Sequence, residues 1–153
     1  MVVNDNLPGL RVGTYNVNGL GNQEKRLQVF NWLKNKEEDI ICLQETHSTP
    51  SAELSWERSW DGKIIFNHGT SNSTGVAVLV KPNVNNLTIT KINHLVEGRA
   101  TLVELELGSE KFCIANIYAP NNDDIGFLET VFHYTLGRPR DDQVIYGGTG
   151  TRS

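Results

Sequence analysis

The feature that most constrains the fold of this chain is a short apolar run, Ile40–Leu43, that leads directly into Gln44 and Glu45. An unbroken apolar run of this length is typical of a strand that is buried on both faces. A carboxylate at the end of such a strand costs free energy unless it binds something. In open α/β sheets, ligands bind at the carboxyl ends of the strands. We therefore expect Glu45 to help hold a ligand.

The segments around this run alternate between strand and helix patterns before they turn to strands alone. Residues 10–16 predict a strand, and residues 23–36 predict a helix with one apolar face. A second helix is expected to start at Pro50, because proline suits the first helical turn. The later candidates are strands at 63–66, 76–80, 87–92, 101–107 and 111–118, a helix at 125–132 and a buried strand at 144–146. This order predicts an α/β fold with a mixed or antiparallel sheet.

Composition narrows the class of protein. The chain has 153 residues, of which 38% are hydrophobic and 21% charged, and this fits one soluble globular domain. Its net charge of −4 is not that of a protein held to nucleic acid by bulk charge, although an acidic nuclease needs only a local basic rim. Cys42 and Cys113 lie in apolar runs and are expected to be reduced core residues. With no signal peptide and no membrane-length apolar run, we expect an intracellular, non-secreted protein without membrane contact.

Two strand ends carry polar side chains that can meet in space. Asn16 and Asn18 follow the first strand, Gln44 and Glu45 follow the second, and their separation suits a strand–helix–strand unit. An amide oxygen with a carboxylate is a donor set suited to Mg²⁺, which keeps several waters and takes few protein ligands. On spacing alone the alternative stays open that Asn16 and Asn18 are turn residues and that Glu45 caps a loop.

A third strand end supplies Tyr118 and Asn121. A tyrosine hydroxyl and an asparagine amide can both donate hydrogen bonds to a phosphate oxygen. Taken alone, this segment is explained better as a core tyrosine followed by a turn at Pro120.

Taken together, these segments resemble the endonuclease/exonuclease/phosphatase superfamily, and most of all the endonuclease domain of non-LTR (LINE-type) retrotransposons. The resemblance runs from Arg11 to about Gly147 and is carried by residues 14–20, 41–47, 75–79, 97–99 and 116–121. It implies a four-layer α/β sandwich of the DNase I-like type over residues 10–147, between a disordered tail at 1–9 and a glycine-rich tail at 148–153. The implied reaction is Mg²⁺-dependent hydrolysis, or nicking, of DNA phosphodiester bonds.

The same resemblance implies roles for individual residues. Asn16 and Glu45 would bind the metal ion, and Asn18 and Gln44 would support these ligands without touching the metal. Tyr118 and Glu45 would be catalytic, and Tyr118 with Asn121 would contact the scissile phosphate of bound DNA. In the family reaction the metal neutralises developing charge, a carboxylate activates water and a histidine stabilises the phosphate oxygens.

The sequence departs from the family pattern near its carboxyl end. The family continues with a strand, a glycine and Asp-x-Asn, and closes with an Asp-His pair. Here the expected Asp and Asn fall on Gly148 and Gly150, and no Asp-His pair follows. The histidines at positions 47, 68, 94 and 133 occupy no family position for the catalytic histidine and are expected to be structural or on the surface. We therefore expect a chain truncated in its carboxyl-terminal half, with a weak or partial Mg²⁺ site and no nuclease activity of its own.

Three hypotheses about function follow: a crippled endonuclease remnant, a phosphodiesterase completed by sequence outside this chain, or a non-enzymatic module that binds nucleic acid or metal. The low positive charge predicts weak binding of DNA, and nuclear access is expected if the domain is functional. If each half of the family sandwich supplies one sheet, this chain leaves one sheet face uncovered. It would then aggregate, or need the missing half or another partner in order to fold.

Overall fold

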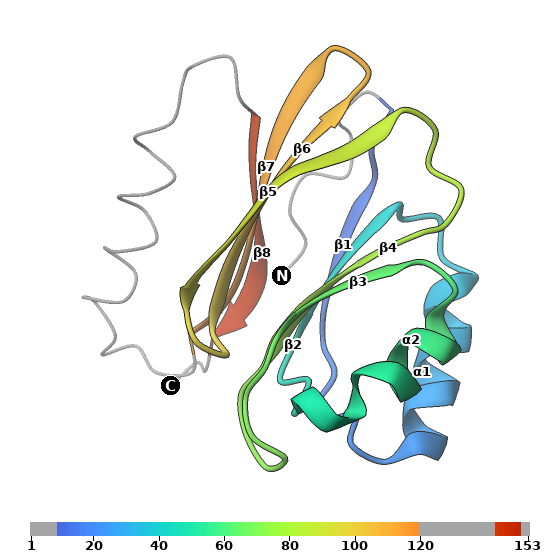
Figure 1. Ribbon diagram of the computed structural model, residues 1–153, viewed down its shortest axis with the longest axis vertical. Helices are drawn as coiled ribbons and strands as arrows, with labels where there is room; N and C mark the ends of the chain where they lie inside the picture. The colour runs from blue at the N-terminus through green and yellow to red at the C-terminus, as the bar shows by residue number, and fades with distance from the viewer. Residues whose placement is uncertain (1–8, 120–142, 151–153) are drawn as a thin grey trace.

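A computed structural model describes residues 9–119 and 143–150 of the chain (Figure 1). In chain order the elements are β1 (Val12–Asn16), α1 (Gln23–Lys34), β2 (Ile40–Gln44), the 3₁₀ helix η1 (Pro50–Ala52), α2 (Glu53–Trp60), β3 (Lys63–Asn67), β4 (Val76–Val80), β5 (Leu87–Val96), β6 (Ala100–Leu107), β7 (Glu110–Ala119) and β8 (Gln143–Gly150). The helix expected at 125–132 lies outside the described residues. Neither described α-helix is long and apolar enough to cross a membrane.

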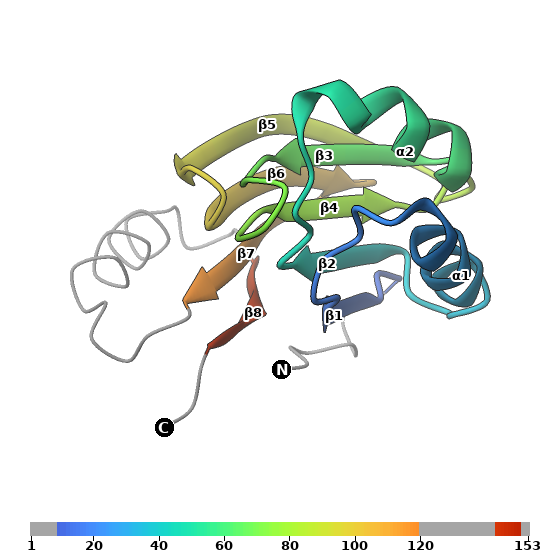
Figure 2. The ribbon, with the colours of Figure 1, turned by 90° about the horizontal axis from the view of Figure 1, so that it is seen from below.

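The strands form two four-stranded sheets in the orders β1-β2-β4-β3 and β5-β6-β7-β8. Each sheet is mixed, because β1 and β2 are parallel in the first sheet and β7 and β8 are parallel in the second. The sheets pack face to face, and α1 and α2 cover the far side of the first sheet (Figures 1 and 2). The chain is therefore an α/β sandwich, which confirms the predicted fold class.

Strand β2 lies at the centre of this arrangement and is buried along its whole length. Ile40 and Cys42 face the second sheet, whereas Ile41 and Leu43 face the helices. Burial on both faces explains why the strand is apolar at consecutive positions rather than at alternate ones. The prediction of a doubly buried strand at this position is confirmed.

The expectation that one sheet would lack a covering layer is wrong, because this chain supplies both sheets. The residues between the sheets form one cluster of buried side chains from both: Leu10, Val12, Ile40, Cys42, Ile65, Val78, Val80, Val103, Leu105, Phe112, Ile114 and Ile145. The antiparallel strands β5, β6 and β7 follow one another along the chain with short connections. They can therefore form the second sheet from local sequence alone.

The last strand also differs from its prediction, which ended it at residue 146. Strand β8 continues to Gly150 and pairs with β7 over its full length, from Phe112↔Gln143 to Ala119↔Gly150. Backbone hydrogen bonding needs no side chains, so the glycines of this segment do not prevent pairing.

The inner faces of the two sheets change character along the strands. Toward the carboxyl ends of β1, β2, β3 and β7 and the start of β6, the apolar core gives way to buried polar side chains, namely Thr14, Gln44, Asn67, Thr101 and Asn116. Buried polar groups of this kind are stable only when they are hydrogen bonded. This polar end of the sandwich positions the residues that the sequence singled out.

Candidate active site at the carboxyl ends of β1, β2 and β7

Glu45 follows β2 directly and lies opposite the end of β7. Its backbone has a φ of 53°, in the left-handed region that few residues other than glycine adopt. Its carboxylate accepts a hydrogen bond of 2.8 Å from the hydroxyl of Tyr118. The structure therefore brings together two of the predicted site residues, which lie in different sheets and 73 positions apart in the chain.

Asn16 is the last residue of β1 and the register partner of Gln44, so it ends the strand beside Glu45. Its side-chain oxygen accepts a hydrogen bond of 3.0 Å from the backbone N–H of Asn18, which has a φ of 51°. The ammonium group of Lys25 donates to the carbonyls of Val17 and Asn18, both at 3.0 Å. Asn16 is thus both a turn-forming residue and a neighbour of Glu45, and the two interpretations of this motif do not exclude each other.

Gln44 is buried and joins the two sheets. Its amide nitrogen donates to the Thr14 hydroxyl at 2.9 Å and to the side-chain oxygen of Asn116 at 3.0 Å. The amide nitrogen of Asn116 donates in turn to two backbone carbonyls, those of Leu43 at 3.1 Å and Ala77 at 2.8 Å. These two carbonyls fix the orientation of the Asn116 amide, and Asn116 then fixes that of Gln44. The side-chain oxygen of Gln44 is left buried without a hydrogen-bond partner in the part of the chain that the structure describes.

The Tyr118 hydroxyl is set up to donate a hydrogen bond. Burial, followed by the hydrogen bond to Glu45 and its negative charge, raises the pKa of Tyr118 to about 12, while the charge of Arg99 opposes this shift. Arg99 is held beside Tyr118 by a backbone hydrogen bond of 2.7 Å from the Tyr118 N–H to the Arg99 carbonyl. At neutral pH the phenol therefore keeps its proton, as a donor to a carboxylate or phosphate oxygen must.

The residues of this site fit a sparse magnesium site. Asn16 and Glu45 offer an amide oxygen and a carboxylate from neighbouring parallel strands, and the buried oxygen of Gln44 still requires a donor. Hard oxygen donors in small number are what Mg²⁺ uses when it keeps most of its waters. Within residues 9–119 and 143–150, no three His, Cys, Asp or Glu side chains lie close enough together to hold a metal ion. The donor set is therefore that of a weak site.

Strand β8 runs beside this site, and its register decides which of its positions face it. Gly148 pairs with Ile117 and Gly150 with Ala119. Ile117 packs on the outer side of the sheet against Leu102, Cys113 and Ala115. Position 147 is an inner position of β8, because an added Cβ there would meet Cys42 and Thr14 at 3.3 to 3.4 Å. The sequence placed the missing Asp and Asn of the family pattern at Gly148 and Gly150, on either side of the register partner of Tyr118.

Two residues that the structure brings into the site had no role assigned from sequence. Asn116 connects Gln44 to the second sheet, and Thr14 accepts a hydrogen bond from Gln44. The available signal for Asn116 was one amide in an otherwise apolar run, residues 112–117. Such a residue must find buried partners, although the sequence does not say which. Asn121, predicted to contact phosphate, lies outside the described residues.

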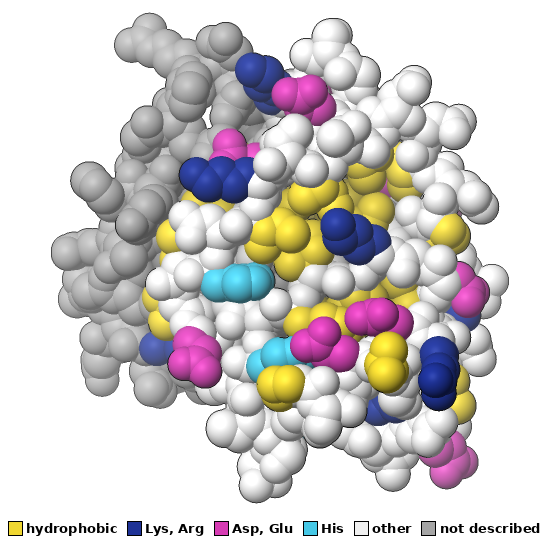
Figure 3. Space-filling view, in the orientation of Figure 1, with side chains coloured by type: hydrophobic (Ala, Val, Ile, Leu, Met, Phe, Trp, Pro, Cys, Tyr) yellow, Lys and Arg dark blue, Asp and Glu magenta, His cyan; other side chains and the backbone are white. Residues whose placement is uncertain are grey.

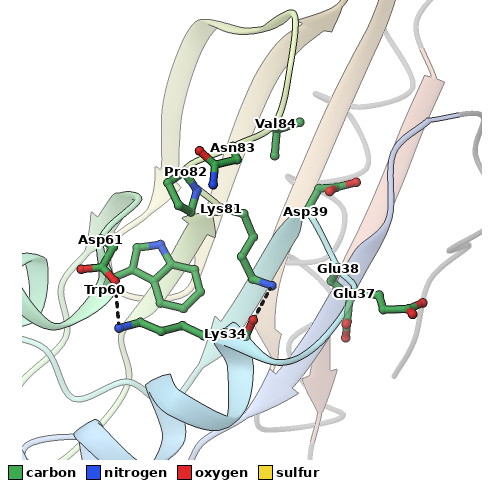
Figure 4. A pocket seen from close by; sticks show the side chains of 10 residues that line it. All are labelled: Lys34, Glu37, Glu38, Asp39, Trp60, Asp61, Lys81, Pro82, Asn83 and Val84. Carbon is green, nitrogen blue, oxygen red and sulfur yellow. Dashed lines mark hydrogen bonds and ion pairs between the residues drawn. The ribbon is translucent and has the colours of Figure 1, made fainter.

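A cavity of about 400 Å³ lies at the opposite end of the sandwich (Figure 4). Its charged groups are already paired: Lys34 with Asp61 at 3.1 Å, Lys81 with the Lys36 carbonyl at 2.7 Å, and the carboxylate of Asp39 with the Arg11 N–H at 3.0 Å. Each of these contacts joins two segments of the chain, so the charged groups around the cavity have a structural role.

Comparison with known proteins agrees with this geometry. The chain is 30% identical over 141 residues to the transposon TX1 uncharacterized 149 kDa protein of Xenopus laevis, an alignment that covers 91% of this chain and 11% of that protein. Among solved structures, an AP endonuclease from Archaeoglobus fulgidus matches with a TM-score of 0.67 and 21% identity, over 91% of this chain and 56% of that one. Humanized D. rerio TDP2 matches with a TM-score of 0.67 and 14% identity, over 88% of this chain and 59% of that one.

These structural matches establish a shared fold. The chain spans a little over half the length of each of the two solved proteins and about a tenth of the length of the transposon protein. The sequence pattern of the Endonuclease/Exonuclease/phosphatase family matches residues 13–146, which is most of the chain. Asn16, Glu45 and Tyr118 all fall within that match. The chain therefore belongs to the endonuclease/exonuclease/phosphatase family.

Proposed function

We propose that this chain is the amino-terminal part of a retrotransposon-type endonuclease domain that retains only half of the catalytic centre. The reaction of the complete domain is Mg²⁺-dependent hydrolysis of DNA phosphodiester bonds. The observation that carries this proposal is the hydrogen bond of 2.8 Å between Tyr118 and Glu45, at a strand end next to Asn16. This hydrogen bond joins the predicted metal ligand, Glu45, to the residue predicted to donate a hydrogen bond to the phosphate, Tyr118.

Each residue of the site has a distinct task in this proposal. Asn16 and Glu45 hold Mg²⁺, which when bound neutralises negative charge that develops on the phosphate. The Tyr118 hydroxyl, protonated at neutral pH, donates a hydrogen bond to a phosphate oxygen, and Asn121 contributes a second donor. Asn18 orients the Asn16 oxygen through its N–H, and Gln44 holds the end of β2 against the second sheet.

The same proposal predicts that the chain alone is inactive. The Asp and Asn of the family pattern fall on Gly148 and Gly150, which have no side chain that could take a proton from water. Loss of a general base costs about 10²–10⁴ in rate, and loss of an electrostatic donor such as a histidine costs about another 10²–10³. Even if these factors overlap, activity falls below what a nicking assay detects.

DNA is the substrate class that the relatives favour. The similarity to a transposon protein, and to a D. rerio TDP2 crystallised with a single-stranded DNA product, supports a nucleic-acid ligand. Binding by this chain is expected to be weak, since its net charge is −4. On the face shown in Figure 3, basic and acidic side chains are interspersed rather than gathered by sign. Action on chromosomal DNA also requires entry into the nucleus, which imaging of a tagged chain would test.

The test is a nicking assay on supercoiled plasmid with Mg²⁺. We expect no nicking by the wild-type chain above that of Glu45→Ala, a variant that removes the predicted metal ligand. Wild-type nicking that disappears in Glu45→Ala would overturn the proposal that the chain is catalytically incomplete.

A second candidate is a phosphodiesterase completed by sequence outside this chain. It is favoured by the lengths of the solved relatives, of which this chain spans 56% and 59%. Its test is to add the carboxyl-terminal half of a longer family member and repeat the assay. Restored nicking that depends on Glu45 would select this candidate. A salt-dependent gel shift without nicking would instead select a non-enzymatic module that binds nucleic acid.

A further inference from the structure

The segment that carries Glu45 has an unusual backbone. Glu45 and His47 have φ values of 53° and 55°, so two non-glycine residues on either side of Thr46 are left-handed. Such conformations are unfavourable and persist only where surrounding contacts impose them. The contacts that impose them here therefore decide where the Glu45 carboxylate lies.

Backbone hydrogen bonds hold this segment from two sides. On one side, the N–H groups of Thr46 and His47 donate to the carbonyls of Gly75 and Thr74, both at 3.0 Å. On the other side, the carbonyls of Glu45 and Thr46 accept from the loop after β1, at 2.6 and 2.9 Å. These contacts bring three loops together and hold the segment up to His47, and side chains hold the turn from Thr46 to Ser48 in addition.

That turn is fixed by a chain of side chains that ends at His68. The Thr46 hydroxyl accepts from the Ser48 N–H at 3.3 Å and donates to the Ser48 hydroxyl at 3.2 Å. The Ser48 hydroxyl lies 2.9 Å from the Nδ1 atom of His68. Thr46 and Ser48 are 0% and 1% exposed, so solvent does not compete for these bonds.

His68 is itself held in one orientation. Its Nε2 atom lies 2.6 Å from the carboxylate of Glu53, and its ring stacks on Phe66 with 5.1 Å between the ring centroids. The carboxylate can only accept, so Nε2 carries a proton, and in the neutral imidazole Nδ1 is then an acceptor. The buried Ser48 hydroxyl therefore donates to His68.

We propose that His68 is a positioning residue for Glu45. By accepting a hydrogen bond from the Ser48 hydroxyl in its neutral form, His68 holds the turn from Thr46 to Ser48 and keeps Glu45 in the left-handed conformation that directs its carboxylate at Tyr118. Without an acceptor at this position, the buried Ser48 hydroxyl is unsatisfied, and the turn relaxes toward one that satisfies it. The functional consequence, a misplaced metal ligand, rests on the function proposed above.

The experiment compares substitutions that keep or remove the acceptor. His68→Leu removes it, whereas His68→Asn retains an oxygen near the position of Nδ1 and gives up the contact with Glu53 and the stacking on Phe66. Ser48→Ala removes the donor instead of the acceptor. His94→Leu is the matched control, because His94 makes a similar hydrogen bond of 2.9 Å to the Thr101 hydroxyl but does not touch the Thr46–Ser48 turn.

The first readout is amide hydrogen exchange of the metal-free protein, resolved by residue with NMR. We expect exchange at Thr46 and His47 to be about tenfold faster or more in His68→Leu and Ser48→Ala, and within about twofold of wild type in His68→Asn and His94→Leu. Unchanged exchange at Thr46 and His47 in a folded His68→Leu variant would overturn the proposal. So would equally faster exchange throughout the molecule, which would mark a general loss of stability.

The second readout is binding of Mn²⁺, used as a paramagnetic substitute for Mg²⁺ and followed by electron paramagnetic resonance. Relative to wild type, the affinity is expected to fall about tenfold or more in His68→Leu and to be retained in His68→Asn, as for other residues that orient a metal ligand. If wild type and Glu45→Ala bind Mn²⁺ equally, the proposed metal site is wrong, and the exchange experiment still decides the role of His68. If wild type binds through Glu45 and His68→Leu binds equally well, the positioning role is wrong while the metal site stands.

Discussion

At the scale of single residues, Gly148 is the position on β8 where a side chain is not accommodated. Parallel pairing puts it opposite Ile117. The glycine has a φ of 153°, and an added Cβ would clash with the Ile117 carbonyl oxygen. The backbone at this position therefore favours glycine.

This contact predicts that a substitution at Gly148 lowers stability. Gly148→Asp is expected to destabilise the fold by about 1–3 kcal/mol, because its backbone must move away from Ile117. Urea denaturation would measure this effect. A Gly148→Asp variant as stable as the wild-type chain would contradict the prediction.

A second prediction concerns Tyr15, at the edge strand β1. Burial, together with its hydrogen bond to Glu38, raises the pKa of Tyr15 well above its ordinary value of 10.0. A raised pKa in the folded state contributes stability that is complete below the unfolded pKa and is lost as pH rises toward the folded pKa. The free energy of unfolding should thus decline above about pH 10, and decline less steeply in Tyr15→Phe. Urea denaturation at a series of alkaline pH values tests this, and identical slopes would refute it.

At the scale of elements, the link between β2 and β7 is the connection that makes the site. Gln44 and Asn116 are both buried, and their mutual hydrogen bond of 3.0 Å joins the two sheets at their polar end. The same two residues hold the strand ends from which Glu45 and Tyr118 extend. The geometry of the candidate site is therefore tied to the packing of the sandwich.

Breaking this buried link is predicted to lower the stability of the fold. Gln44→Leu leaves Asn116 and Thr14 without their donor, and should lower the free energy of unfolding by about 1–3 kcal/mol. The matched control is Gln28→Leu on the exposed face of α1, with an expected change within about 0.5 kcal/mol. A double-mutant cycle with Asn116→Ala should show coupling of about 1 kcal/mol or more. Additive effects would mean that the two residues act independently.

Much of this element-level picture could be predicted from sequence, and the rest depends on distant contacts. Strands β2 and β4 and helix α1 follow from local patterns, and the convergence of Asn16, Glu45 and Tyr118 follows from the resemblance to a family. The partners of Gln44 do not, because Asn116 is 72 positions away and any buried acceptor would satisfy the amide. The length of β8 also escaped prediction, since it continues through glycines to Gly150 by backbone pairing with β7.

At the scale of the whole molecule, the core between the two sheets changes what we expect of the isolated chain. Every described strand either pairs on both sides or packs on this core. A second cluster joins the first sheet to α1 and α2 through Phe30, Leu33, Trp56 and Trp60. Sandwiched between both clusters, the first sheet couples the second sheet to the helices.

We therefore predict that the two clusters unfold together. Ile114→Ala, between the sheets, and Ile41→Ala, under the helices, should each lower the free energy of unfolding by about 2–4 kcal/mol within one cooperative transition. Ile92→Ala, at a position 40% exposed on β5, is the control and should change it far less. Thermal unfolding followed by both near- and far-ultraviolet circular dichroism would report this. Two separate transitions, or aggregation of the wild-type chain before it melts, would support dependence on a partner instead.

The bridge between Gln44 and Asn116 has a consequence for how such domains decay over evolutionary time. Both amides contribute to folding, so selection for a stable chain preserves them even after the reaction is lost. Glu45 is only partly buried and contributes to folding through one hydrogen bond to Tyr118, so drift removes it at a smaller cost in stability. In a set of diverging inactive copies, Gln44 and Asn116 should therefore persist longer than Glu45. Retention of Gln44 in such copies would indicate selection for folding, and retention of Glu45 would indicate selection for catalysis.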